Sequence, residues 1–164
     1  MQRLWAPWRI EYITRGDLDS GKCFLCEKKD TPQKDEENFV LYRGKTCFAL
    51  LNTYPYNNGH FMVAPYRHIG DFTALKDEEL LEMMKIAQIG IEALQKSMGA
   101  QGFNIGFNLG RVAGAGLVDH IHLHIVPRWG GDTNFMPVLG NTKVLSEALE
   151  RTYERLLPYF KGIL

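Results

Sequence analysis

Three histidines alternate with aliphatic residues in the segment VDHIHLHIVPRW, residues 118–129. Side chains of an extended strand point to opposite faces with a period of two, so His120, His122 and His124 are expected to share one face. Neutral imidazole has an unprotonated nitrogen that can attack phosphorus or bind a metal ion. The pattern therefore predicts a functional site, built either for nucleophilic chemistry or as an all-histidine metal centre.

Two cysteines stand in the sequence CFLC, and three interpretations compete for them. A redox pair normally opens a helix after a strand, which the charged segment following Cys26 does not resemble. Two buried thiols without a function are a second possibility. We favour a tetrahedral zinc site on Cys23 and Cys26, with His68 and His120 as the two further ligands. Cys47 lies in an apolar segment and is predicted to be a core residue.

A glycine-rich segment, NLGRVAGAGLVD at residues 108–119, leads directly into the histidines. Consecutive backbone amides in a tight turn can form an anion-binding nest, and glycine allows the backbone to approach the anion closely. The segment lacks the Gly-Lys-Ser/Thr ending of a P-loop. We therefore expect this loop to hold a phosphate group against an imidazole.

Five short segments are predicted to be strands, because they are apolar and are bounded by turn-forming residues. They cover residues 38–43, 46–52, 60–65, 102–108 and 120–127. The first three follow one another through short turns, the second of which is YPYNNG. This order predicts an antiparallel meander.

Two amphipathic segments predict helices. The long one runs from Asp77 to Gly99, with an apolar stripe of Leu80, Met84, Ala87, Ile91, Leu94 and Met98. The second runs from a cap at Asn141 to Pro158 as a helix breaker. The charged residues 28–38 are predicted to be a solvated loop. Strands grouped around one long helix predict an α+β fold, with residues 1–164 forming one domain.

The composition narrows the classes of function. The formal net charge is zero and the basic residues are scattered, so a nucleic-acid partner is not expected. No apolar run approaches the roughly 20 residues of a membrane span, and the N-terminal residues lack a signal-peptide core. Three cysteines argue against a disulfide scaffold. We expect a protein of the cytoplasm without a membrane segment.

The histidine motif resembles that of a known family. HIHLHIV matches the signature of the histidine-triad superfamily of nucleotide hydrolases and transferases, and FALLNTYPYNNGHFMVAPYRH resembles the strands and turn that precede it there. PRWGGD is similar to the fragile-histidine-triad branch, and LWAPWRIEY and GDTNFMPV resemble a bacterial subgroup of diadenosine tetraphosphate phosphorylases. The similarity runs from about residue 23 to residue 134. It implies an antiparallel sheet of about five strands with one long helix and a C-terminal helix.

The resemblance also implies residue roles. His122 corresponds to the family's nucleophile, which becomes nucleotidylated, and His124 is expected to share the charge of the phosphate oxygens. Asn52 matches an asparagine that binds the ribose hydroxyls, and His60 falls near the phosphates. The zinc ligands of zinc-bearing members match Cys23, Cys26, His68 and His120. The phosphate chain is expected at Asn108, Gly114, Ala115 and Gly116.

Two departures from the family pattern bear on which molecule, inorganic phosphate or water, accepts the nucleotide from His122. The loop before His120 is one residue longer than in the hydrolase branches, and Leu117 replaces a Ser or Thr that contacts the scissile phosphate in some members. Backbone amides of the loop would have to supply that contact. Together with the resemblance to the phosphorylase subgroup, this favours inorganic phosphate over water as the acceptor for a nucleotide held on His122.

Other interpretations remain open. The chain can instead be a hydrolase of dinucleoside polyphosphates or nucleoside phosphoramidates. From other classes, it can be a zinc-stabilised nucleotide-binding module with little turnover, or a metalloenzyme that uses all three triad histidines as ligands. The resemblance further implies a homodimer whose sheets join across the interface.

Overall fold

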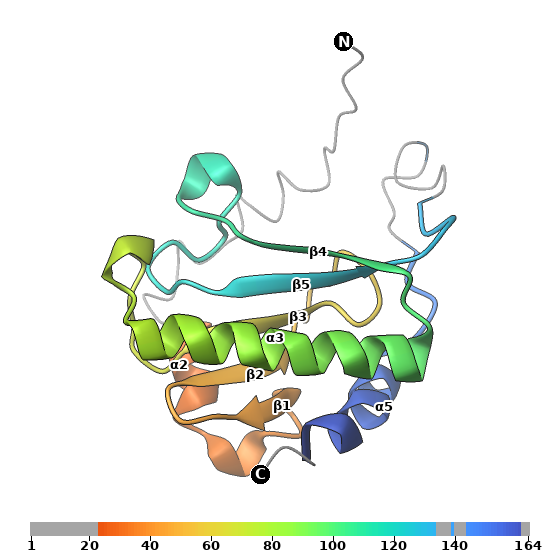
Figure 1. Ribbon diagram of the computed structural model, residues 1–164, viewed down its shortest axis with the longest axis horizontal. Helices are drawn as coiled ribbons and strands as arrows, with labels where there is room; N and C mark the ends of the chain where they lie inside the picture. Colours follow the sequence, from red (N-terminus) through yellow and green to blue (C-terminus); the bar gives the residue numbers. More distant parts are fainter. Residues whose placement is uncertain (1–22, 134–138, 140–143, 162–164) are drawn as a thin grey trace.

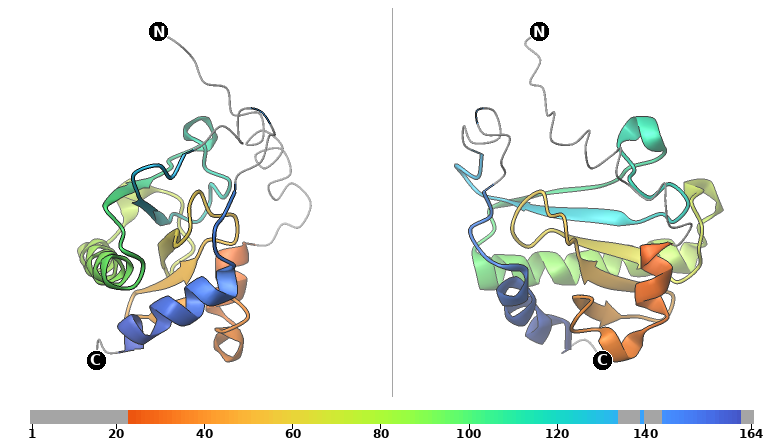
Figure 2. Two further views of the ribbon diagram at one scale, coloured as in Figure 1. Left: turned by 90° about the vertical axis from the view of Figure 1, so that its right-hand side faces the viewer. Right: turned by 180° about the vertical axis from the view of Figure 1, so that it is seen from behind.

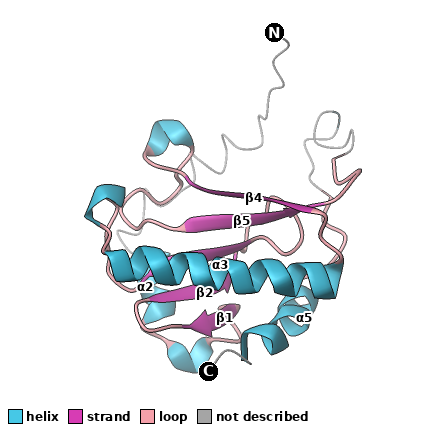
Figure 3. Cartoon of the chain, in the orientation of Figure 1, coloured by secondary structure: helices cyan, strands magenta, loops and turns pink. Residues whose placement is uncertain are grey.

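The computed structural model describes residues 23–133, 139 and 144–161. Its centre is a five-stranded antiparallel sheet with the strand order β1-β2-β3-β5-β4 (Figures 1 and 3). The strands are β1 Val40–Arg43, β2 Cys47–Leu51, β3 Phe61–Pro65, β4 Gly102–Phe107 and β5 Leu123–Arg128. The predicted meander is confirmed in β1, β2 and β3, and the α+β class is confirmed as well.

The long helix α3, Asp77–Met98, crosses one face of the sheet (Figure 1). It begins where Glu79 caps the backbone amide of Lys76, and it ends at Gly99, whose φ of 63° is left-handed and favours glycine. Both boundaries were predicted. The predicted apolar stripe faces the core except at Met84, which is 50% exposed, whereas the neighbouring Met83 is buried.

Gly90 belongs to the buried face of α3, although the predicted stripe did not include it. A Cβ atom there would lie 2.1 Å from the Phe61 ring, so the helix lies closest to the sheet at a residue that carries no side chain. The buried face of α3 is therefore centred on Met83, Ile86 and Gly90. A stripe drawn through large apolar side chains alone cannot locate this contact.

Two shorter helices correct the prediction. Helix α2, Phe24–Lys29, and the 3₁₀ turn η1, Pro32–Lys34, occupy part of the segment that was predicted to be a solvated loop. Figure 2 shows α2 on the face of the sheet opposite to α3. Its Leu25 is completely buried among sheet residues, and this apolar contact holds α2 on the sheet.

Helix α5, Leu149–Lys161, starts later than predicted and includes Pro158. The proposed cap at Asn141 lies outside the described residues, and residues 144–148 are not helical. Pro158 falls in the last turn, where proline removes one hydrogen bond but does not end the helix. Buried Tyr153, Leu156 and Phe160 hold α5 against the core beside α3 and β1.

The two faces of the sheet have different neighbours. On one face, Phe61, Val63, Leu123 and Ile125 pack with α3 and α5 in the main core. On the other, a smaller apolar cluster consists of Leu25, Val40, Phe48, Leu50, Met62 and Ala64. Because Met62 pairs with His124 across β3 and β5, the histidines share this second face. None of the helices in the described part of the chain could span a membrane.

Candidate active site and metal centre

The three triad histidines are buried where the chain enters β5. His124 is the second residue of β5, whereas His120 and His122 precede the strand, which is therefore shorter than the predicted span. The three residues are 0%, 8% and 8% exposed. The rings of His122 and His124 lie 4.7 Å apart, while the His120 ring lies 5.2 Å from that of His68. The triad is thus divided between two sites.

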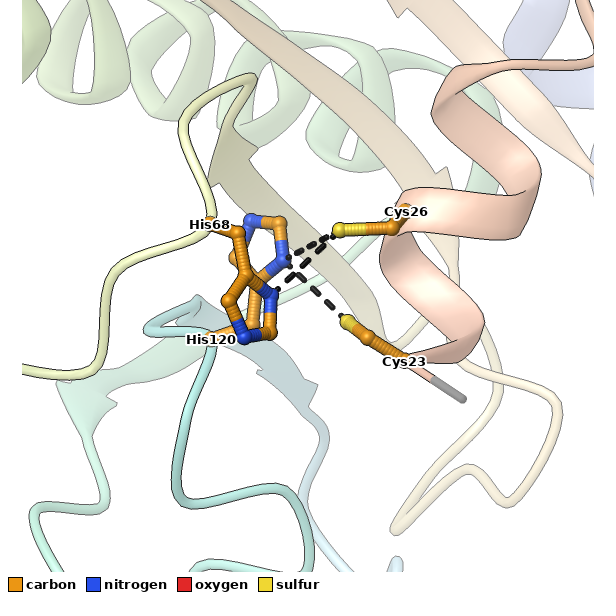
Figure 4. A group of neighbouring side chains, drawn as sticks. All are labelled: Cys23, Cys26, His68 and His120. Atoms are coloured by element: carbon orange, nitrogen blue, oxygen red, sulfur yellow. Dashed lines mark hydrogen bonds between the residues drawn. The ribbon is translucent and has the colours of Figure 1, made fainter. Parts of the chain in front are cut away.

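The first site brings together the four residues predicted to bind zinc. The ligand atoms of Cys23, Cys26, His68 and His120 all lie within 4.8 Å of one another (Figure 4). His120 Nδ1 is 3.2 Å from Cys23 Sγ and 3.5 Å from Cys26 Sγ, and His68 Nδ1 is 3.4 Å from Cys26 Sγ. In tetrahedral zinc sites, typical bond lengths place sulfur and nitrogen ligands about 3.6 Å apart. The cluster therefore fits one ion of this kind.

The protonation of His120 suits a metal ligand. Its Nε2 lies 2.8 Å from the carbonyl oxygen of Pro65, which can only accept, so Nε2 carries the proton. The lone pair is then on Nδ1, which faces the sulfurs. Burial lowers the pKa of His120 to about 4, so the ring is neutral at physiological pH. Burial also raises the pKa of Cys23 to about 11, and a bound cation would favour its thiolate.

Two backbone contacts hold the metal ligands in place. The amide of Ile121 donates to the carbonyl of Ile69 at 2.7 Å, which sets the segments of His68 and His120 side by side. A Cβ atom at Gly70 would lie 2.4 Å from the carbonyl oxygen of Val118, so this close approach requires glycine. The segments that carry His68 and His120 therefore lie in close backbone contact at Gly70.

An arginine fixes the helix that carries the cysteines. Arg43 donates to the carbonyls of Lys28 and Lys29 at 2.8 and 3.0 Å, at the C-terminal end of α2. Its guanidinium also binds both carboxylate oxygens of Asp35. These contacts anchor α2 to β1, so the two thiols face the imidazoles from a fixed direction.

The second site is centred on His122. Its Nδ1 lies 2.9 Å from the carbonyl oxygen of His120, so Nδ1 carries the proton and Nε2 carries the lone pair. Burial lowers the pKa of His122, and the hydrogen bond to His120 partly opposes this effect. The neutral ring thus presents an unprotonated Nε2, which is the form required of a nucleophile.

A chain of hydrogen bonds sets the tautomer of His124. The amide of Tyr56 donates to Nδ1 of His60 at 3.1 Å, and Asn52 Nδ2 lies 3.4 Å from the same atom. His60 therefore carries its proton on Nε2, which lies 3.0 Å from His124 Nδ1. His124 must accept there and carry its own proton on Nε2. Burial, followed by the neighbouring His124, lowers the pKa of His60 to about 2, so His60 stays neutral.

Three of the predicted substrate residues belong to this chain of hydrogen bonds: His60 itself, Asn52 and Asn108. Asn52 is buried next to His60, and its Oδ1 accepts from the amide of Tyr54. Asn108 lies 3.4 Å from His124 Nε2. The Asn108 atom nearest to it is Nδ2. Because His124 Nε2 carries a proton in this tautomer, the Asn108 amide must turn its oxygen towards the ring for a hydrogen bond to form. Both asparagines thus border the His124 ring or its support.

The glycine-rich loop uses part of its hydrogen-bonding capacity internally. It contains the 3₁₀ turn η3, Arg111–Ala113, between Gly110 and Gly114, both with positive φ. The amides of Gly114 and Ala115 donate to carbonyls of Arg111 and Gly110. Among the described residues, the amide of Gly116 makes no such backbone bond. Of the three expected phosphate donors, Gly116 is therefore the one that the loop's own turns do not use.

Sequence reasoning missed Tyr56. The segment YPYNNG was interpreted only as a turn, yet the Tyr56 ring lies 4.6 Å from the His60 ring and stacks on His124 at 5.9 Å. Its backbone amide makes the hydrogen bond that fixes His60. The turn directly before Gly59 and His60 was the available signal for a contact to His60. The contact is made by a backbone N–H, which nearly every residue type has, so the sequence does not single out Tyr56.

Comparison with known proteins places this geometry in a family. Residues 33–131 match the HIT domain model. A Mycobacterium tuberculosis protein named AP-4-A phosphorylase is 43% identical over 162 residues, covering 96% of this chain and 83% of that protein. The predicted histidine-triad enzyme agrees with this relative's name.

Solved structures agree with the fold. A Zn-bound histidine triad family protein from Mycobacterium smegmatis superposes with a TM-score of 0.68 at 26% identity, covering 87% of this chain and 95% of that one. Diadenosine triphosphate hydrolase from Plasmodium falciparum has a TM-score of 0.58 at 20% identity, over 77% of each chain, and shares the fold alone. The chain therefore belongs to the histidine-triad (HIT) family, as its motif predicts.

Proposed function

We propose that this protein transfers a nucleotidyl group from a dinucleoside polyphosphate, such as diadenosine tetraphosphate, through a covalent intermediate on His122. The observation that carries the proposal is the hydrogen bond from His122 Nδ1 to the His120 carbonyl, which leaves Nε2 unprotonated. The name of the 43% identical relative supports the substrate class.

The first step forms a bond between His122 Nε2 and the α-phosphorus, and the bond from that phosphorus to the leaving nucleotide oxygen breaks. The leaving group departs with the electron pair of that bond as a nucleotide anion. His124 Nε2–H, whose proton position follows from His60, donates to a phosphate oxygen as charge develops there. We assign the ribose hydroxyls to Asn52 and the phosphate chain to Asn108, as the family resemblance implies.

The second step breaks the new phosphorus–nitrogen bond when an acceptor oxygen attacks. With inorganic phosphate as the acceptor, diadenosine tetraphosphate gives ATP in the first step and ADP in the second. Leu117 supports this choice, because it supplies no hydroxyl for a phosphate or water contact, and it packs against the apolar cluster around Leu25. The amide of Gly116 is the loop donor that we assign to the phosphates.

The decisive experiment uses isotopically labelled inorganic phosphate with unlabelled diadenosine tetraphosphate. A phosphorylase places the label in the β-phosphate of ADP and forms ATP in equal amount, and it nearly stops when phosphate is omitted. AMP plus ATP at the same rate with or without phosphate identifies a hydrolase. A protein that binds the dinucleotide without releasing any product is a binding module.

We also propose that Cys23, Cys26, His68 and His120 hold one structural zinc ion. The fit of the four ligand atoms supports this assignment, as does the Zn-bound relative. A bound ion would fix α2 to the segment whose carbonyl orients His122. The free thiols suit a reducing compartment, and we therefore place the protein in the cytoplasm.

We propose a homodimer joined at strand β4. This strand lies at the edge of the sheet, and Asn104, Ile105 and Gly106 are exposed in its middle. An exposed edge presents unpaired backbone groups that a second copy can cover. Light scattering on the purified protein tests this, with Ile105→Lys as the variant expected to give monomers.

A further inference from the structure

The PRWGGD motif ends in a carboxylate that the proposed reaction does not use. Asp132 has a side chain only 8% exposed, yet it belongs to a loop after β5. Arg128 binds both of its oxygens, at 2.7 and 3.0 Å, and holds the pKa of Asp132 well below its usual range. The amide of Trp129 and the hydroxyl of Thr133 donate to it as well. Asp132 is therefore an ionised and rigidly held acceptor.

This acceptor reaches the turn that precedes His60. Asn57 Nδ2 donates to Asp132 Oδ2 at 2.8 Å and also to the carbonyl of Pro127 at 3.1 Å. The backbone of Asn57 is engaged too, because its carbonyl accepts from the amide of His60 at 3.1 Å. Asn57 is 8% exposed. Its position is consequently set by β5 and by Asp132 rather than by the turn alone.

Tyr56 is the residue immediately before Asn57, so holding Asn57 also orients the Tyr56 amide. This amide is the N–H donor that makes His60 Nδ1 an acceptor. If the Tyr56 amide turned away from the ring, His60 could carry its proton on Nδ1 instead of Nε2. Its Nε2 would then be an acceptor, and His124 would have to carry the proton on Nδ1. The donor aimed at the substrate would be lost.

We propose that Asp132 is a positioning residue of the active site, which holds Asn57 so that the Tyr56 amide fixes the tautomers of His60 and His124. Asp132 acts on His60 indirectly: it binds the side chain of Asn57, and the amide of the adjacent Tyr56 donates to His60. The effect of Asp132 on turnover rests on the proposed function, whereas its effect on the tautomers does not.

The test is made on the full-length, metal-loaded protein with ¹⁵N-labelled histidine. In the parent, the nitrogen resonances of His60 and His124 should each show a protonated Nε2 and an unprotonated Nδ1. Asp132→Asn keeps the shape but weakens both the ion pair and the acceptor. We expect resonances averaged between tautomers, kcat lowered about 10- to 100-fold, as for other groups that orient a site residue, and KM within about twofold of the parent.

A second variant tests the hydrogen bond between Asn57 and Asp132. Asn57→Asp replaces the donor by an acceptor of the same shape and repels Asp132, so it should shift the same two tautomers. The matched control is Asp35→Asn, which breaks another bidentate pair, with Arg43, away from the His60 turn. The control should lower stability and leave the His60 and His124 resonances unchanged.

Unchanged tautomers in either Asp132→Asn or Asn57→Asp overturn the inference, and so does an equal change in the Asp35→Asn control. Altered tautomers in both site variants support it, whether or not the protein turns over the dinucleotide. Absence of turnover in the parent would therefore reject the proposed function and leave the assignment of Asp132 standing.

Discussion

The Nδ1 atom of His122 lies 2.9 Å from the carbonyl oxygen of His120, so the proposed nucleophile and a proposed metal ligand are joined through one backbone hydrogen bond. The side chain of His120 is in turn held by Pro65 and by the cysteine cluster. A change at the metal cluster can therefore alter the direction of the His122 lone pair without any contact to substrate.

Removing the nucleophile should abolish the covalent step. We expect His122→Asn to lower kcat by roughly a thousandfold or more while nucleotide binding persists, because binding groups outside the ring are retained. Steady-state kinetics and calorimetric titration with a nucleotide measure the two effects separately. Turnover within about tenfold of the parent would show that another residue is the nucleophile.

Removing a thiol from the metal cluster should release the ion. Cys23→Ser and Cys26→Ser are expected to lose bound zinc, to melt at a lower temperature and to have a lower kcat, since His120 is loosened. Metal analysis after purification without chelators gives the stoichiometry. Cys47→Ala is the matched control: it removes a buried thiol from the core and should retain one zinc per chain. A parent protein without any metal would contradict this prediction.

Gly70 offers a test of the backbone contact that aligns the two imidazoles. Gly70→Ala places a Cβ atom 2.4 Å from the Val118 carbonyl oxygen, so the two segments must separate. We expect a loss of about 1–3 kcal/mol in unfolding free energy, together with weaker zinc retention. In Gly102→Ala the new atom meets nothing closer than 4.0 Å, and this control should be nearly neutral. Equal losses of unfolding free energy and of zinc in the two variants would show that the close approach at Gly70 is not the cause.

The strands could be predicted because they are short apolar runs bounded by turn-forming residues, and the long helix because its apolar residues recur at helical spacing. Asp77 and Gly99 mark the ends of α3 by chemistry that lies within a few residues. The failures involve tertiary contacts: α3 approaches Phe61 closely at Gly90, and α5 continues through Pro158 with Phe160 buried in the core. Neither contact has a local signal.

The site was predictable where the side chain itself does the chemistry. The four metal ligands were named from residue type and resemblance, and the structure brings them together. Tyr56 and Asp132 were not found, because the first acts through a backbone amide and the second through Asn57, which is 75 positions away in the sequence. Residues that position a catalytic side chain through another residue can be found only when the packing of the loops against each other is known.

Acidification should destabilise the protein through His60. An unfolded histidine has a pKa near 6.5, whereas burial, followed by the neighbouring His124, lowers the pKa of folded His60 to about 2. Between these values the unfolded state binds more protons, so the stability that His60 contributes falls as the pH drops below about 6.5. We expect His60→Gln, which does not titrate, to have a shallower decline in unfolding free energy between pH 7.5 and pH 5. Urea unfolding of both proteins at several pH values measures the slopes, and identical slopes would show that His60 is protonated in the folded protein within this range.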